Sequence, residues 1–198
     1  SLTLAYRVAS EKELEEIKKI STSLTEVISF RSMVSTTNQG NNYYQALVQV
    51  KSVDKNYPLA GKIKINPELS IEDALKKKGD KYGIIVEDSL LKQLNLKIGS
   101  DLILGKSTYN IRATLSSIPD IGSNGFSLGP KVILNTTSLK NSGLLNKGTL
   151  FETNYYLETE NNQDLENLKS LFFKKNFDKG FRWRDIRNPA PGIEAVVN

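Results

Sequence analysis

Apolar and polar side chains alternate at the start of the chain. In the stretch LTLAYRV, residues 2–8, every second position is apolar, which is the period of a strand with one buried face. Ser10 and Glu13 follow at the spacing of a capping box, the side-chain arrangement that opens many helices. The pattern therefore predicts a strand followed by a helix.

The predicted helix has one apolar face. Its apolar residues recur at intervals of three and four, as burial of one helix face requires. They are Leu14, Ile17, Ile20 and Leu24. On the exposed side, Glu15 and Lys19 have the spacing of a supporting ion pair.

Two β-rich runs, 26–35 and 43–53, come next, separated by TTNQGNN at residues 36–42. Gly and Asn tolerate positive φ and suit the tip of a hairpin. The predicted order of elements up to this point is β-α-β-β.

A β-α-β pattern returns near the C-terminus. Residues 153–158 predict a strand, Asn161 or Asn162 a helix cap, and 181–186 a second strand. The helix between them has apolar residues at helical spacing, namely Leu165, Leu168, Leu171 and Phe172.

The middle of the chain differs in character. It predicts a short capped helix over 70–78 closed by Gly79, a strand over 83–87, a helical turn over 89–94 and several short strands. Because the outer pieces are too small to cover a sheet alone, we expect them to pack together. The sequence therefore predicts an α+β fold: a discontinuous βαβ lobe from residues 1–56 and 145–198, with an inserted β-rich lobe over 57–144.

The stretch LKIGSDLILGKST, residues 96–108, resembles a phosphate-binding loop. The Walker A pattern has four residues between its glycines, whereas Gly99 and Gly105 are separated by five. A phosphate loop also leads into a helix, while residues 109–116 alternate like a strand. We interpret 101–104 and 109–116 as a hairpin whose turn contains Lys106.

Two further motifs are weak. Residues 117–134 contain three glycines that could cradle an anion, but no helix follows at once, so an exposed loop that enters a strand at 131–135 is favoured. Residues 135–137 (NTT) match a glycosylation sequon, a match expected by chance in a chain rich in Asn and Thr.

Composition narrows the functional classes. The 198 residues include no Cys and no His, which removes thiol and imidazole catalysis, disulfides and zinc clusters. The net charge of +5 comes from dispersed lysines, and we expect no nucleic-acid partner. No apolar run is long enough to cross a bilayer, and we expect the chain to be an excised domain.

Aromatic and acidic residues near the C-terminus leave alternatives open. Trp183 could stack on a base or sugar, but an aromatic on a terminal strand is more often a core residue. In the pair Tyr155-Tyr156, one ring should be buried because neighbours on a strand face opposite sides. Nothing in the spacing fixes Asp185 beside Asp178 or Glu194 as an acid/base pair.

A family resemblance rests on the order of five segments. These are VISFRSMVS, VKSVDKNYPLAGKIKI, LLKQLNLKIGSDLILGKSTYNIRATLSSIPD, FSLGPKVILNTTSLKNSGL and FRWRDIRNPAPGI. Their succession over residues 29–193 resembles the large extracytoplasmic domain of MacB/FtsX-superfamily permeases, closest to the branch encoded beside a lysophospholipase-type esterase. The first helix resembles the family in pattern only.

The resemblance implies an extracytoplasmic (periplasmic) domain of an inner-membrane ABC transporter permease, with a porter-like βαβ lobe near the membrane and an inserted β-rich lobe further out. It implies a separate cytoplasmic ATPase subunit as partner, an unknown extracytoplasmic substrate or partner, and a membrane-embedded full-length protein for which dimerisation stays open. The domain would transmit ATPase-driven motion to, or handle, a lipid, lipoprotein or envelope protein. It would be no enzyme, with no catalytic residues, no cofactor and no metal site.

Two other functions remain open. A stand-alone soluble binding domain for a lipid, peptide or glycan would show a deep apolar cleft. A hydrolase using carboxylates or a Ser/Lys pair would show convergent polar side chains with perturbed pKa values in one pocket.

Overall fold

The computed structural model describes residues 1–37, 43–117, 129–146, 148–159, 165–176 and 179–184. Its strands are β1 (Leu2–Ala5), β2 (Ser23–Thr36), β3 (Gln45–Val53), β4 (Lys64–Asn66), β5 (Lys77–Lys78), β6 (Lys81–Glu87), β7 (Asp101–Leu104), β8 (Ser107–Ser117), β9 (Lys131–Asn135), β10 (Phe151–Glu158) and β11 (Arg182–Trp183). Its helices are α1 (Glu11–Lys19), α2 (Ile71–Leu75), α3 (Asp88–Leu94), α4 (Thr136–Asn141) and α5 (Leu165–Asn176).

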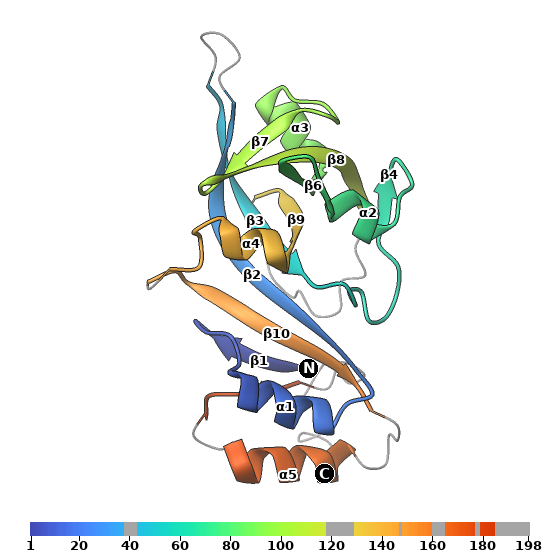
Figure 1. Cartoon of the computed structure of the whole chain (residues 1–198), viewed down its shortest axis with the longest axis vertical. Helices are drawn as coiled ribbons and strands as arrows, with labels where there is room; N and C mark the ends of the chain where they lie inside the picture. Colours follow the sequence, from blue (N-terminus) through green and yellow to red (C-terminus); the bar gives the residue numbers. More distant parts are fainter. Residues whose placement is uncertain (38–42, 118–128, 147, 160–164, 177–178, 185–198) are drawn as a thin grey trace, which may run out of the picture.

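One mixed sheet runs through the molecule. Its strand order is β11-β1-β10-β2-β3-β9-β6-β8-β4, with β5 paired to β6 and β7 paired to β2 and β8. Figure 1 shows β2 passing diagonally from the lower layer of β1, β10, α1 and α5 to the hairpin at the top. The fold is α+β, as the sequence predicts.

The start of α1 confirms the capping box. The Ser10 hydroxyl accepts a hydrogen bond from the Glu13 N–H at 3.4 Å, and the Glu13 carboxylate accepts one from the Ser10 N–H at 2.8 Å. These bonds satisfy two N–H groups that have no partner within the helix.

The boundaries around α1 differ from the prediction. Strand β1 ends at Ala5, and Tyr6 takes a positive φ of 61°, which leaves Tyr6 and Val8 exposed instead of on a buried strand face. Helix α1 ends at Lys19, so Leu24 lies on β2 and not on the helix. The cause is sheet pairing, because the Thr22 N–H donates to the Glu158 carbonyl of β10 at 2.8 Å.

Other predictions for the first half are mostly confirmed. β2 and β3 pair antiparallel from Val27↔Val53 to Ser35↔Gln45, although residues 38–42 of the expected tip lie outside the described residues. The expected pair between Glu15 and Lys19 is wrong, since Lys19 pairs with Glu16 at 3.5 Å.

The lower core lies between the sheet and the two long helices. It consists of Leu2, Leu4, Ala9, Ile17, Tyr155, Phe172 and Phe181. β1 lies between β10 and β11, pairing antiparallel with both, so both ends of the chain contribute to this core. The predicted C-terminal β-α-β order is confirmed for β10, α5 and β11, while Asn161, Asn162 and residues 185–186 lie outside the described residues.

The upper part of the sheet is covered on both faces. One face packs on α3 and α4 through a central core that includes Leu90, Leu94 and Leu139. The other face packs on α2 through a second cluster that includes Ala74 and Leu75.

Helix α2 is shorter than predicted. It ends at Leu75, and Lys76 is extended with ψ at 158°. Lys77 and Lys78 form β5 and pair with β6, and Gly79 at φ +62° makes the connecting turn. Sheet pairing therefore overrides the helical pattern over residues 76–78.

The predicted division into two lobes remains a prediction. The segment 57–144 contains β4 to β9 together with α2, α3 and α4. The hydrogen-bonded sheet continues across both predicted boundaries, because β3 pairs with β9 and β2 pairs with β7.

The β7–β8 hairpin is confirmed, with Leu104 opposite Ser107. At the turn, Gly105 has φ +62°, and a Cβ there would lie 2.6 Å from the Ser142 carbonyl oxygen and 2.8 Å from Leu144 Cγ. Gly105 is thus required both by its φ and by the close approach of the segment after α4.

We expect Gly105→Ala to lower the free energy of unfolding by about 2–4 kcal/mol, since it combines left-handed strain with overpacking. Gly79→Ala is the matched control, because Gly79 has the same φ of +62° with nothing within 4 Å of an added Cβ. The control should cost about 1–2 kcal/mol. Urea unfolding measures both, and equal losses would contradict the packing argument.

Candidate functional site

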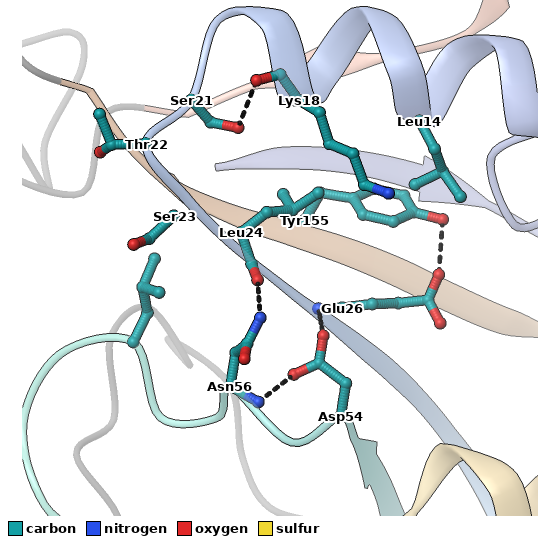
Figure 2. Close-up of a pocket in the computed structure, with 11 residues that line it drawn as sticks. Leu14, Lys18, Ser21, Thr22, Ser23, Leu24, Glu26, Asp54, Asn56 and Tyr155 are labelled. Carbon is teal, nitrogen blue, oxygen red and sulfur yellow. Dashed lines mark hydrogen bonds between the residues drawn. The ribbon is translucent and has the colours of Figure 1, made fainter.

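A groove opens beside the lower core, between the end of α1, the start of β2 and the loop after β3. Its volume is about 750 Å³. The lining residues are Leu14, Lys18, Ser21, Thr22, Ser23, Leu24, Glu26, Asp54, Asn56, Leu59 and Tyr155 (Figure 2). The groove therefore combines an apolar side, several hydroxyl and amide groups, two carboxylates and one lysine.

Tyr155 and Glu26 form the wall that separates the groove from the core. They are cross-strand neighbours on β10 and β2. The fully buried Tyr155 donates its hydroxyl proton to Glu26 Oε2 at 2.9 Å and accepts a hydrogen bond from the Ala9 N–H at 2.8 Å. Burial raises the pKa of the Tyr155 hydroxyl above its ordinary value, so this group stays a neutral donor that orients the carboxylate.

Asp54 fixes the loop that forms the opposite wall. Its carboxylate accepts hydrogen bonds from the Thr25 hydroxyl at 2.5 Å, the Glu26 N–H at 2.7 Å and the Asn56 N–H at 3.0 Å. Asn56 in turn donates its side-chain amide to the Leu24 carbonyl at 2.8 Å. These bonds tie the loop after β3 to the start of β2. The wall of the groove opposite Tyr155 is therefore held in a fixed position.

The sequence carries one sign of this site, which no motif reveals. Leu24, Glu26 and Ile28 occupy alternate positions of β2, and so lie on one side of the strand. Leu24 packs against the lower core and Ile28 belongs to the central core. A carboxylate between two core-facing positions is costly to bury and can indicate a binding site.

A second polar cluster ties α1 to the C-terminal segment. Arg7 makes two hydrogen bonds to the Glu13 carboxylate, at 2.8 and 2.9 Å, and a third to the Lys179 carbonyl at 2.5 Å. Its guanidinium carbon also lies 5.5 Å from the centre of the Phe181 ring. Hydrogen bonding from Arg7 lowers the pKa of Glu13 to about 2.

The residues of the Walker-like stretch form no phosphate loop. Lys106 is exposed in the β7–β8 turn, where its N–H donates to the Ser142 carbonyl at 2.9 Å. Gly99 and Gly105 take positive φ, at 92° and 62°, in the turns before and after β7, which agrees with the hairpin interpretation.

The other motifs are only partly within the described residues. Of the glycine-rich stretch, residues 118–128 lie outside them, and so do Asp178, Asp185 and Glu194. Strand β9 follows where expected. The Asn135 side chain caps α4 by accepting from the Ser138 N–H at 2.7 Å, and its amide donates to the Leu75 carbonyl at 2.8 Å. This amide is engaged in the fold, which argues against glycosylation there.

The C-terminal aromatics serve the core. Trp183 is half-buried and packs against the lower core, which agrees with its interpretation as a core residue. Tyr155 is fully buried and Tyr156 is half-buried against the α2 side of the sheet. The expectation that one ring of the pair is buried is confirmed.

The described residues contain no group of three or more acidic side chains placed to hold a metal ion. In the same part of the chain, no helix has the length and hydropathy needed to cross a membrane.

Two solved transporter domains share this fold. The periplasmic region of MacB from Actinobacillus actinomycetemcomitans matches with a TM-score of 0.60 and 14% identity, over 100% of this chain and 94% of that one. The extracellular domain of the noncanonic ABC-type transporter YknZ from Gram-positive bacteria matches with a TM-score of 0.56 and 12% identity, over 89% of each chain. The structure therefore has the fold of MacB-like periplasmic domains.

A permease from Escherichia coli is similar to this chain in sequence. The chain is 27% identical over 150 residues to an uncharacterized ABC transporter permease, YbbP, of Escherichia coli (strain K12). The match covers 76% of this chain but 17% of YbbP, so the chain corresponds to a small part of that permease. No protein-family model matches the sequence.

We expect Glu13→Gln to lower the free energy of unfolding at pH 7 by about 1–2 kcal/mol, because glutamine keeps the cap but loses the ion pair with a partly exposed Arg7. The pKa of Glu13 is about 2 in the folded chain against an ordinary 4.5. The ion-pair contribution is therefore full above pH 4.5 and is lost as the pH falls towards 2. Urea unfolding of both proteins across this range measures the difference.

Glu16→Gln on the same helix is the control, since Glu16 makes longer contacts of 3.5 Å with Lys19 and Lys175. Its effect should be smaller than that of Glu13→Gln at pH 7. A Glu13→Gln deficit that stays constant down to pH 2 would contradict the assignment.

We expect Lys106→Ala to change the free energy of unfolding by less than about 0.5 kcal/mol, because the side chain is exposed in a turn. ATP titration monitored by calorimetry should give no heat of binding with either protein. Binding that Lys106→Ala abolishes would restore the phosphate-loop interpretation.

Proposed function

We propose that the chain is the extracytoplasmic domain of an ABC-type permease subunit. The observation that supports this most directly is the pairing of the first and last described strands. Leu2 lies opposite Trp183, and the Arg184 N–H donates to the Ser1 carbonyl at 2.9 Å. The chain thus enters β1 and leaves β11 at adjacent points, which is compatible with a domain carried between two neighbouring membrane helices.

The MacB-like fold and the sequence similarity to a permease are consistent with this proposal. Under it, the domain lies on the periplasmic or outer side of the inner (cytoplasmic) membrane. A separate cytoplasmic polypeptide carries the ATPase, and the domain passes ATPase-driven motion to a lipid, lipoprotein or envelope protein. We further propose that the permease belongs to the branch encoded beside a lysophospholipase-type esterase. Assembly of the full-length protein as a dimer is part of the same proposal.

The sheet offers a physical route for such motion. β2 has 14 residues and takes part in pairs with β10, β3 and β7. A displacement at the β1–β11 end would be carried along a hydrogen-bonded strand to the upper part, because a packed sheet resists local deformation. No catalytic group is needed for this role.

A stand-alone binding domain remains the second candidate, and the groove beside α1 is the observation that favours it. Its volume of about 750 Å³ is in the range of small-molecule sites. A permease domain would be attached to the membrane part of a larger protein, whereas a stand-alone binding domain would be soluble.

Cysteine labelling in the full-length permease tests the proposed location. The chain has no cysteine, so Lys140→Cys on the exposed side of α4 provides one reactive site. The experiment uses intact spheroplasts that contain a full-length permease with no other reactive cysteine. A membrane-impermeant maleimide should label Lys140→Cys fully.

Ser138→Cys on the same helix is the matched control, because Ser138 is 1% exposed and should react only after unfolding. Labelling of Lys140→Cys only after lysis would place the domain in the cytoplasm and overturn the proposal. Recovery of the full-length protein in the soluble fraction would favour the stand-alone binding domain.

A further inference from the structure

The position of Glu26 is unusual for a charged residue. It lies on the same side of β2 as Leu24 and Ile28, beside the lower core, and is only partly exposed. A carboxylate removed from most of its water needs compensating hydrogen bonds or a counter-charge. Tyr155 supplies one hydrogen bond, to Oε2.

A counter-charge for Glu26 is missing among the described residues, where none of the ion pairs includes it. Lys18 lines the same groove from the last turn of α1, but pairs with no carboxylate within 4.0 Å in that part of the chain. Asp54, the other carboxylate of the groove, already accepts three hydrogen bonds from the loop and β2. Glu26 is therefore the carboxylate of the groove that can accept further hydrogen bonds from a ligand.

We propose that this groove binds a small amphipathic molecule with a primary ammonium group. The ammonium would donate to the Glu26 carboxylate, and a short apolar stem would lie against Leu14, Leu24 and Leu59. The groove of about 750 Å³ has ample room for a ligand of this kind. The site holds whether or not the chain works in a permease.

The chemistry favours a compact cation over an anion or a neutral donor. An ammonium is a compact point charge that can reach Glu26 Oε1 with a single hydrogen bond, while Oε2 keeps its bond from Tyr155. An anionic ligand would meet two carboxylates against one lysine in the lining. A neutral alcohol would leave the charge on Glu26 uncompensated.

Lys18 gives the proposal a second, opposite test. Its positive charge in the same groove repels a bound ammonium, so its removal should strengthen binding while removal of the Glu26 charge weakens it. Two single substitutions with opposite expected signs separate a specific charge effect from general damage to the groove.

The test titrates the ¹⁵N-labelled 198-residue chain with hexylammonium chloride and follows amide chemical shifts. We expect saturable shifts around Glu26, Asn56 and Tyr155. Glu26→Gln, which keeps an acceptor for the Tyr155 hydroxyl, should weaken binding about five- to tenfold. Lys18→Gln should tighten it about twofold. Lys19→Gln, next along α1 and outside the lining, is the matched control and should leave the affinity unchanged.

1-Hexanol is the neutral comparison and should bind about five- to tenfold more weakly than hexylammonium to the unmodified chain. This comparison needs no substitution, so it stays informative if Glu26→Gln fails to fold. Equal affinity for the two compounds, or an affinity unchanged by Glu26→Gln in a folded protein, would overturn the proposal. Changes in amide chemical shift that are confined to residues away from the groove would also overturn the proposal.

Discussion

The pairing register of β2 is the constraint on which both ends of the molecule depend. β10 pairs with its first eight residues, Ser23–Phe30, and β7 with its last three, Val34–Thr36, while β3 spans the middle. One side of the strand contributes Leu24 to the lower core and Ile28, Phe30 and Val34 to the central core. A slip of one residue would turn all four side chains to the opposite face and disrupt both cores together.

Features with short-range causes could be predicted from the sequence. The capping box of Ser10 and Glu13 and the hairpin around Gly105 depend on residues within a few positions of each other, and both are present. Runs rich in β-forming residues located β2 and β3, and alternation located β8. The strand expected over 153–158 is β10, and the errors in these strands are confined to their ends. The α+β class followed from the order of these elements, because that order limits how their apolar faces can be covered.

What could not be predicted depends on distant partners. Leu24 satisfies a helical spacing, but pairing of the chain with β10 from Thr22 onward makes it a strand residue. Residues 76–78 continue a helical pattern in the sequence, but Lys77 and Lys78 pair with β6 and so form a strand. The contacts of Arg7 with Lys179 and Phe181 and the groove around Glu26 have the same character, since they form only when α1 and β2 meet segments from later in the chain. A charged residue at a core-facing strand position was the one local sign of that groove.

The place of β1 in the sheet also has a consequence for how the chain becomes folded. Its two neighbours, β10 and β11, are among the last strands in the sequence. During synthesis, residues 1–5 have neither partner strand until more than 150 further residues have been made. Strands β2 and β3 can pair with each other much earlier. Because non-local pairing is slow to form, we expect the lower core to form after the β2–β3 pair. Leu2 and Leu4 would then stay exposed on the newly made chain until β10 and β11 are available.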